Sequence, residues 1–352
     1  MCSDQWATVS KSYKQEILSN NSLKPLLTNF PDPFAFPNGV DSKVKIADLS
    51  KLEDHATEKI KLLKEFFKIK HENSKAYDDY ILFGFVGRIC TQKGVMLILD
   101  ACEEILFKTG YMAVFIIGGK VDGSKYSYQC ADRMKYLTNK YPKNFWANPD
   151  EFFYKGANLN RGADFFLMPS MFEPGGIVQH EALIAGTPVI AFKTGGLRDS
   201  IQDFIYADAT GNGFTFQAFN SYDFTISLLR AIDCYRNKPM YEQLRANCAT
   251  SFMDISIVVQ AWKGEFYRLF NKVPVDCEFL GSGVDASKLY QNLLEKIQKR
   301  TKPQFKIRDP FRNNIRVTYK TELDNWKNEH ALTFNASEGT WECHNAPAGI
   351  YQ

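Results

Sequence analysis

The sequence predicts an α/β fold in which helices cover both faces of a doubly wound parallel sheet, followed by a small β-rich appendage. Three observations predict it: short segments that are apolar throughout, segments with a helical period between them, and glycine-containing turns at their junctions. Strands that are apolar on both sides are typical of a parallel sheet buried between two helix layers. Ligand sites in such sheets lie at the carboxyl ends of the strands.

The elements follow in a regular order from residue 80. The apolar run YILFGFVG predicts the first strand, and the spacing of apolar residues in 93–110 predicts the helix after it. The expected order is strand 80–87, helix 93–110, strand 112–119, helix 128–141, strand 164–169, helix 175–186, strand 188–192, helix 197–204 and strand 213–216. Further helices are expected at 52–70, 222–236, 239–250, 256–270 and 286–300. The last fifty residues alternate in β fashion without a helical period.

The composition limits the classes of protein to which the chain can belong. The chain has 352 residues, 45% of them hydrophobic and 24% charged, which is ample material for a core. The net charge of +3, without a basic stripe interleaved with aromatic residues, does not indicate a nucleic-acid partner. The longest apolar run, 80–87, is too short to cross a membrane, and residues 1–10 lack the features of a signal peptide. We expect a globular protein with no membrane span.

The eight cysteines are scattered and form no CxxC pair, so the sequence indicates neither a zinc site nor a thioredoxin-like site. Without secretory features, we expect all eight to be reduced thiols in a cytosol-like compartment.

The first candidate site follows the first strand, in FVGRICTQKGV. Gly87 permits close approach of the backbone, and Arg88 and Lys93 place two cations between a strand end and a helix start. A helix amino terminus already favours anions, so this arrangement suits a diphosphate. The alternative is that both cations are ordinary solvated surface charges.

The second candidate site is the stretch PSMFEPGGIVQHE. A strand ends, the chain bends through Glu173 and Pro174, and a helix is expected to begin at Gly175. Gly175 and Gly176 leave backbone N–H groups uncovered for a hydroxylated or anionic ligand. Glu181 lies two helical turns into the expected helix, on the same face. The alternatives are a helix-terminal acid for Glu173 and a surface residue for Glu181.

The third candidate is the turn Thr194-Gly195-Gly196, again between a strand end and a helix start. A plain turn would use the same residues. Three such turns at one edge of one sheet are stronger evidence for a ligand site than any of them alone.

These motifs together resemble the carboxyl-terminal domain of bacterial glycogen synthases and plant starch synthases. The resemblance rests on FVGRICTQKGV and DFFLMPSMFEPGGIVQHEALIAGTPVIAFKTGGLRDSI, and on ATVSKSYKQEI, FPNGVD, TGNGFTF and AWKGEFYRLF in the same order. It covers about residues 5–270. It implies the carboxyl-terminal half of a GT-B fold, in a retaining glucosyltransferase that extends an α-1,4-glucan from ADP-glucose or UDP-glucose without a further cofactor or metal.

Carried onto this sequence, the resemblance places the donor diphosphate on Arg88 and Lys93. It places the donor glucose at Glu173 and the N–H groups of Gly175 and Gly176. The turn at 194–196 then lies near the nucleotide and its distal phosphate.

Two residues depart from the synthase pattern. Gly175 stands where these synthases usually have Cys, and Glu181 where they usually have an aromatic residue or His. The resulting E-x7-E spacing is that of the broader group of retaining GT-B enzymes, which leaves Glu181 as a candidate by wider analogy and the subfamily open.

The resemblance also implies a division of the chain. Residues 1–42 correspond to the end of an amino-terminal domain and an interdomain link, 43–272 to the nucleotide-sugar-binding domain, 273–302 to a linker and helix, and 303–352 to a small β module. The family's amino-terminal domain, with its Lys-x-Gly-Gly-Leu loop and catalytic His, would lie upstream of Met1, so we expect it to act in cis or in trans. The compartment is then the cytoplasm, or a plastid if an upstream transit segment is missing.

The module at 303–352 is weakly similar to starch-binding β-sandwiches, in which exposed tryptophans stack on glucose rings. Trp326 and Trp341 are the candidate glucan-binding residues. A core role for both is the alternative.

Two other functions fit the same residues. One is a non-catalytic scaffold domain that keeps the fold within an assembly, and the other is a GT-B transferase with a different acceptor. Loss of glucan elongation on Glu173→Ala or Lys93→Ala separates an enzyme from a scaffold.

Overall fold

The structure, a computed structural model, describes most of the chain up to residue 271. It covers residues 6–19, 24–27 and 33–271, and the strand residues 305–308, 318–319, 330–331, 333–335 and 340–343. The chain separates into two compact units, Met1–Leu269 and Phe270–Gln352.

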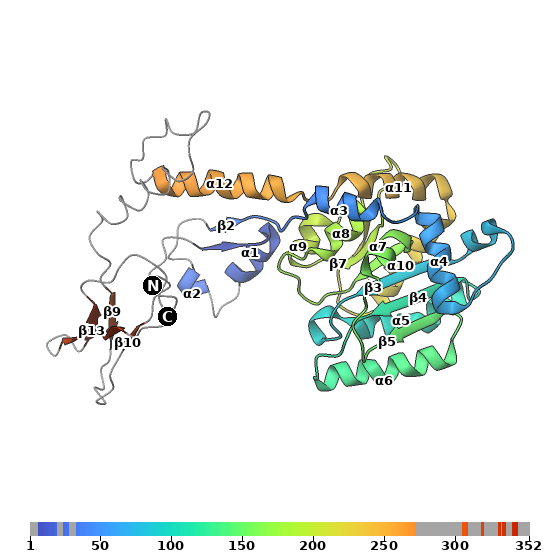
Figure 1. Cartoon of the computed structure of the whole chain (residues 1–352), viewed down its shortest axis with the longest axis horizontal. Coiled ribbons are helices and arrows are strands. Elements are labelled where there is room, and N and C mark those ends of the chain that lie inside the picture. The colour runs from blue at the N-terminus through green and yellow to red at the C-terminus, as the bar shows by residue number, and fades with distance from the viewer. Residues whose placement is uncertain are drawn as a thin grey trace. The chain divides into compact units, whose positions relative to one another are not determined.

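A six-stranded sheet forms the centre of the first unit, with all its strands parallel (Figure 1). The strands are β3 (Ile81–Val86), β4 (Ala113–Gly118), β5 (Phe145–Asn148), β6 (Phe165–Met168), β7 (Val189–Phe192) and β8 (Gly213–Phe216). Their spatial order is β5-β4-β3-β6-β7-β8, so the order reverses between β3 and β6. The predicted doubly wound parallel sheet is confirmed, and the reversal is the point at which such sheets bind ligands.

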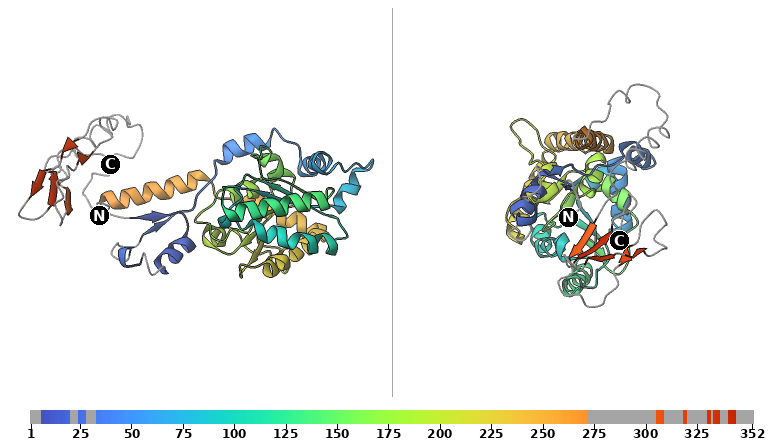
Figure 2. Two further views of the ribbon diagram at one scale, coloured as in Figure 1. Left: turned by 90° about the horizontal axis from the view of Figure 1, so that it is seen from below. Right: turned by 90° about the vertical axis from the view of Figure 1, so that its left-hand side faces the viewer.

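Helices cover both faces of this sheet (Figures 1 and 2). The helices around the sheet are α3 (Ser42–Leu49), α4 (His55–Phe67), α5 (Val95–Lys108), α6 (Lys125–Lys140), α7 (Gly156–Gly162), α8 (Val178–Ile184), α9 (Gly195–Ser200), α10 (Ser221–Arg236) and α11 (Lys238–Thr250). A further helix, α12 (Ile255–Asn271), runs away from the sheet (Figure 1). Short 3-10 turns precede β3 and α5, at Ser74–Asp79 and Thr91–Lys93.

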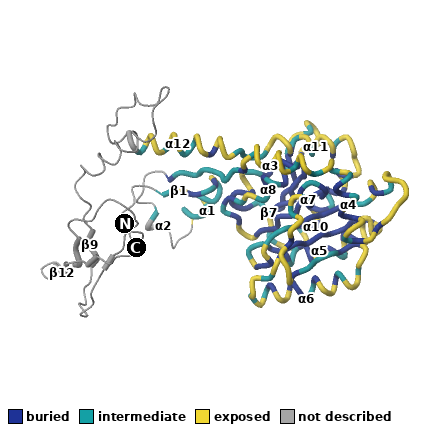
Figure 3. Tube along the Cα trace, in the orientation of Figure 1, coloured by how far each residue is buried: buried dark blue, intermediate teal, exposed yellow. Residues whose placement is uncertain are grey.

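The strands are apolar throughout because successive side chains enter two different cores. On β3, Phe83 and Phe85 belong to the larger core, under α5 and α10, while Leu82 belongs to a smaller one. The smaller core also contains Leu63 of α4 and Leu159 of α7. Figure 3 shows the strands as buried, with exposed residues gathered on the outer sides of the helices.

A row of phenylalanine rings crosses the sheet on the larger-core face. Phe83 stacks on Phe115 at 5.0 Å between ring centroids and on Phe165 at 5.7 Å. Phe145 continues the row on one side and Phe214 on the other. Offset rings at these separations add to the free energy gained by burial, and they fix the register of five of the six strands.

Several elements of the first unit differ from the sequence expectation. β5, α7 and α3 are absent from it: β5 is a four-residue edge strand, α7 has seven residues, and α3 has no buried residue to give it an apolar stripe. The helix expected at 175–186 begins at Val178 instead, because Gly176 has a φ of +67° that no α-helix contains.

The residues before the sheet also belong to the first unit. β1 (Ala7–Thr8) pairs in parallel with β2 (Phe34–Ala35), and α1 (Lys11–Ser19) contacts α9. A short helix, α2, covers Lys24–Leu27. Val40 pairs with Asp254 just before α12, which attaches the segment leading into α3 to the main body.

The second unit contains two small antiparallel sheets among its described residues. One has the order β12-β13-β9 and the other pairs β10 with β11. The strands are β9 (Phe305–Arg308), β10 (Thr318–Tyr319), β11 (His330–Ala331), β12 (Thr333–Asn335) and β13 (Thr340–Cys343). Trp341 lies in β13, while Trp326 and the helix expected at 286–300 lie outside the described residues.

Among the helices that the structure describes, none combines the length and apolar character that crossing a bilayer requires.

Candidate functional site

The turns after β3 and β6 are joined to each other at the carboxyl edge of the sheet. The backbone N–H of Met171 donates to the carbonyl oxygen of Gln92 at 2.8 Å, and Gln92 Nε2 donates to the carbonyl oxygen of Phe172 at 3.2 Å. These bonds connect residues about eighty positions apart in sequence. They hold the first and second candidate sites side by side.

Lys93 and Glu173 form an ion pair at this junction. Lys93 Nζ lies 2.5 Å from Glu173 Oε2, and their side chains are 20% and 8% exposed. Ser170 Oγ approaches the same carboxylate oxygen at 3.4 Å. A cation and a carboxylate are therefore fixed together, with the lysine as the more accessible partner.

Arg88 lies in the same β3–α5 turn and is exposed. Within the described part of the chain it has no ion pair, so its guanidinium is free to meet an anion. The neighbouring Gly87 donates its N–H to the carbonyl oxygen of Gly118, which anchors the start of the turn on β4.

The two glycines after Pro174 present free backbone donors. The N–H groups of Gly175 and Gly176 have no acceptor among the described residues. A Cβ at Gly175 would lie 2.7 Å from Val9 and from Asn38 Nδ2, so any side chain would displace the segments that pack here. Glu173, Gly175 and Gly176 thus combine a buried carboxylate with two unpaired donors, although they precede the helix rather than belong to it.

The turn Thr194-Gly195-Gly196 lies beside this stretch, but its glycine N–H groups are already engaged. Gly196 donates to the carbonyl oxygen of Glu173 and Gly195 to Glu16 Oε1, both at 2.8 Å. The turn therefore supports the backbone of Glu173. Thr194 of this turn is buried.

Glu181 does not share a helix face with Glu173, contrary to the sequence expectation. Because α8 begins at Val178, the helical period does not extend back to Glu173. Glu181 instead pairs with Lys45 of α3, with 2.5 Å between Nζ and Oε1. The two glutamates of the E-x7-E spacing thus occupy two separate ion pairs.

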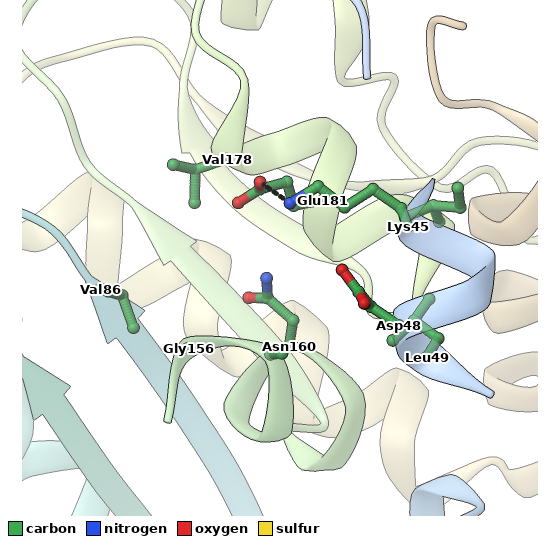
Figure 4. A pocket seen from close by; sticks show the side chains of 10 residues that line it. Lys45, Asp48, Leu49, Val86, Gly156, Asn160, Val178 and Glu181 are labelled. Carbon is green, nitrogen blue, oxygen red and sulfur yellow. Dashed lines mark ion pairs between the residues drawn. The ribbon is translucent and has the colours of Figure 1, made fainter. Parts of the chain in front are cut away.

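The Lys45–Glu181 pair borders a cavity of about 150 Å³, which we name the Glu181 pocket (Figure 4). Val86, at the end of β3, lines it directly before Gly87 and Arg88, so the pocket adjoins the first candidate site. The lining residues are Lys45, Asp48, Leu49, Val86, Gly156, Ala157, Asn160, Val178, Glu181 and Ile184.

Three polar residues of this pocket, Lys45, Asp48 and Asn160, are not singled out by the sequence. Lys45 and Asp48 lie on α3, whose amino end is capped by Asp41 through a 3.1 Å bond from the N–H of Val44. An aspartate two residues after the Asn38-Gly39 turn is a helix-start signal that could have revealed α3. Nothing in the sequence around Asn160 indicates its contact with residues more than a hundred positions away.

A second cavity, of about 530 Å³, lies at the opposite edge of the sheet and is built around paired charges. Asp164 accepts hydrogen bonds from the N–H of Leu82 and from Tyr241, and Lys59 Nζ lies 2.7 Å away. Burial alone would raise the pKa of Asp164, but Lys59 and then His55 outweigh it and lower the pKa. The network ties α4, β3 and α11 together, which is a structural role.

The described cysteines Cys90, Cys102, Cys130, Cys234 and Cys248 are free and buried. No group of three or more His, Cys, Asp and Glu side chains that could hold a metal ion occurs among the described residues.

Comparison with known proteins gives the following likenesses. The family model described as "Glycosyl transferases group 1" matches residues 66–249. A glycogen synthase of Bacillus cereus is 31% identical over 257 residues, which are 69% of this chain and 51% of that protein. A glycogen synthase of Finegoldia magna is 32% identical over 252 residues, 67% of this chain and 50% of that protein. The chain spans about half the length of the curated relatives it matches.

Solved structures agree in fold. The catalytic domain of starch synthase IV from Arabidopsis thaliana, bound to ADP and acarbose, superposes with a TM-score of 0.64 at 23% identity, covering 76% of this chain and 56% of that one. A sucrose-phosphate synthase from Thermosynechococcus elongatus gives a TM-score of 0.53 at 16% identity, covering 76% and 58%.

Proposed function

This chain belongs to the glycosyl transferases of group 1, and we propose that it binds ADP-glucose or UDP-glucose for retaining transfer to an α-1,4-glucan. The observation that carries the proposal is the junction of the β3 and β6 turns. There Lys93 pairs with the buried carboxylate of Glu173, and Arg88 and two unpaired N–H groups lie in the same two turns, at the switch point of the sheet. The likeness to glycogen synthases supports glucose as the sugar and a glucan as the acceptor.

Each group has a distinct task in this proposal. Arg88 and Lys93 bind the diphosphate, while Glu173 accepts hydrogen bonds from the glucose hydroxyls and the N–H groups of Gly175 and Gly176 donate to the sugar. When the bond between the anomeric carbon and the phosphate oxygen breaks, negative charge grows on the leaving nucleoside diphosphate. Fixed cations and N–H dipoles stabilise that charge without reorganising.

The ion pair with Glu173 prepares Lys93 for this task. A carboxylate at 2.5 Å holds the ammonium in place, so little side-chain entropy is lost when a phosphate arrives. The remaining 20% exposure of Lys93 leaves a side on which a phosphate can approach.

The remaining parts of the proposal concern partners. An amino-terminal domain, in the same chain or another, closes the cleft and supplies the acceptor side. Trp326 and Trp341 of the second unit bind glucan, and the reaction takes place in the cytoplasm, where the buried thiols stay reduced.

Titration of the chain with ADP-glucose and UDP-glucose, followed by calorimetry, tests donor binding. We expect one of the two to bind, and Arg88→Met to weaken it by roughly 10- to 100-fold, the effect of losing a charged hydrogen bond. Arg88 is exposed and has no ion pair in the described part of the chain, so the variant should unfold at the same urea concentration as the parent.

Lys143→Met is the matched control, because Lys143 is an exposed lysine just before β5, at the other edge of the sheet. It should bind the donor like the parent. No heat and no chemical-shift change with either sugar nucleotide, or with ADP and UDP, would contradict the proposed function.

A further inference from the structure

Asn160 is a buried polar residue with an unused acceptor. The residue is 8% exposed, and its side-chain oxygen Oδ1 is buried and has no hydrogen-bond partner among the described residues. Its backbone carbonyl oxygen, by contrast, accepts a hydrogen bond from Thr187 Oγ1 at 2.6 Å. An unpaired buried amide oxygen opposes folding, whereas an apolar side chain of the same size would not.

The side chain points into the Glu181 pocket. Figure 4 shows the amide on α7 turned toward the space between Val86, Val178 and the Lys45–Glu181 pair. Apolar residues form much of the wall around it, and no donor in the described part of the chain lies within hydrogen-bonding distance of Oδ1. A ligand that enters the pocket with a hydroxyl or N–H group would supply one.

The position of the Glu181 pocket indicates which part of the sugar nucleotide it would hold. In the proposed function the glucose lies at Glu173 and the diphosphate at Arg88 and Lys93. Val86 lines the pocket and precedes Arg88 by two residues, so the pocket begins where the diphosphate site ends. The part of a sugar nucleotide that remains is the nucleoside, and a cavity of about 150 Å³ holds one of its rings.

We propose that Asn160 determines donor specificity by accepting a hydrogen bond from a hydroxyl or N–H group of the nucleoside. This inference rests on the proposed function. It explains why an acceptor that lowers the stability of the free protein is present at this position. It also gives α7, which the sequence did not predict, a contact with the ligand.

Asn160→Leu tests the inference, because leucine has a similar volume and no polar atom. The variant should unfold at a temperature about 2 °C or more above that of the parent, since a buried unpaired group is removed. It should also bind the preferred sugar nucleotide roughly 5- to 100-fold more weakly. The free nucleoside diphosphate should show the same loss, because the contact is to the nucleoside.

Asn158→Leu is the matched control on the same helix. Asn158 Nδ2 donates to Glu58 Oε2 at 3.0 Å and does not line the pocket. This variant should therefore lose stability and keep its donor affinity, the reverse of Asn160→Leu.

The outcomes separate the inference from the proposed function. Unchanged donor affinity in Asn160→Leu, or a loss for the sugar nucleotide that the free diphosphate does not share, overturns the role of Asn160 and leaves the function standing. A fall in both stability and affinity overturns it as well, because it marks a structural residue. Absence of donor binding by the parent chain overturns both.

Discussion

Lys93 and Glu173 show how a single contact prepares a site. Both side chains have lost most of their contact with water, and their mutual attraction at 2.5 Å offsets part of the cost of desolvating the two charges. Breaking such a pair leaves a buried charge, so any variant at Lys93 alters stability and binding together. Arg88, exposed and unpaired within the described residues, is the residue at which binding can be changed alone.

His180 is buried for structural reasons, next to a residue that the sequence marked as functional. It is 4% exposed, and its Nδ1 accepts a hydrogen bond from the N–H of Met253 at 3.2 Å. Burial lowers the pKa of His180 from 6.5 to about 4. The folded protein thus binds this proton less readily than the unfolded chain does.

Stability should therefore fall as the pH drops from 6.5 toward 4, since protons then favour the unfolded chain. Between about pH 7 and about pH 5 the loss from His180 should be about 2 kcal/mol, measured by urea unfolding at each pH. Acidic groups with lowered pKa values, such as Glu103 at about 2, contribute mainly below this range.

The matched variant is His180→Asn, whose side-chain oxygen can still accept from Met253 but does not titrate. Between about pH 7 and about pH 5, the unfolding free energy of this variant should fall by about 2 kcal/mol less than that of the parent. Equal pH dependence in the parent and the variant would show that His180 does not titrate on unfolding.

At the scale of the element, α5 is bounded by two glycines of similar backbone conformation and different surroundings. Gly94 has a φ of +64° and Gly110 a φ of +60°. A Cβ at Gly94 would clash with the carbonyl oxygen of Pro169 at the end of β6, whereas nothing lies within 4 Å of one at Gly110. Gly94 permits the close approach of the β3 and β6 turns that brings Lys93 to Glu173.

Gly110→Ala should cost about 1 kcal/mol of unfolding free energy, the strain of a left-handed alanine. Gly94→Ala should cost at least about 2 kcal/mol more, because overpacking adds to that strain, and it should weaken donor binding. Urea unfolding and donor titration of both variants measure the difference. If both variants lost the same unfolding free energy, the β3 and β6 turns would be able to move apart at Gly94 without loss of stability.

At the scale of the whole molecule, the residues of the proposed donor site all belong to the first compact unit. The larger core, the smaller core and both junction turns lie before residue 270. The free energy of folding this unit should therefore come from contacts within it.

A chain ending at Asn271 should fold cooperatively and bind the preferred donor with the affinity of the full chain, as measured by calorimetry. In a gel that contains soluble glucan, the full chain should be retarded and the truncated chain should not, because the proposal assigns glucan binding to Trp326 and Trp341 of the second unit. Loss of donor binding on truncation would place part of the donor site beyond residue 271, and equal retardation of both chains would assign glucan binding to the first unit.

The parallel sheet could be predicted from the amino-acid sequence, because buried strands must be apolar on both faces and their helices must repeat every 3.6 residues. The glycine turns at the strand ends could be located in the same way, since positive φ and close approach both require glycine. The likeness to glucan synthases is visible in the same segments, and the family match agrees with it.

Which charges meet could be learned from the folded chain alone. The start of α8 at Val178 separates Glu173 from Glu181, and α3 brings Lys45 to Glu181 from 136 positions away in sequence. The fold also buries Asn160 Oδ1 in the same pocket without a hydrogen-bond partner among the described residues. A local sequence pattern specifies helices, strands and turns. The partner of a side chain depends on which distant segments pack against it, and only the tertiary structure decides that.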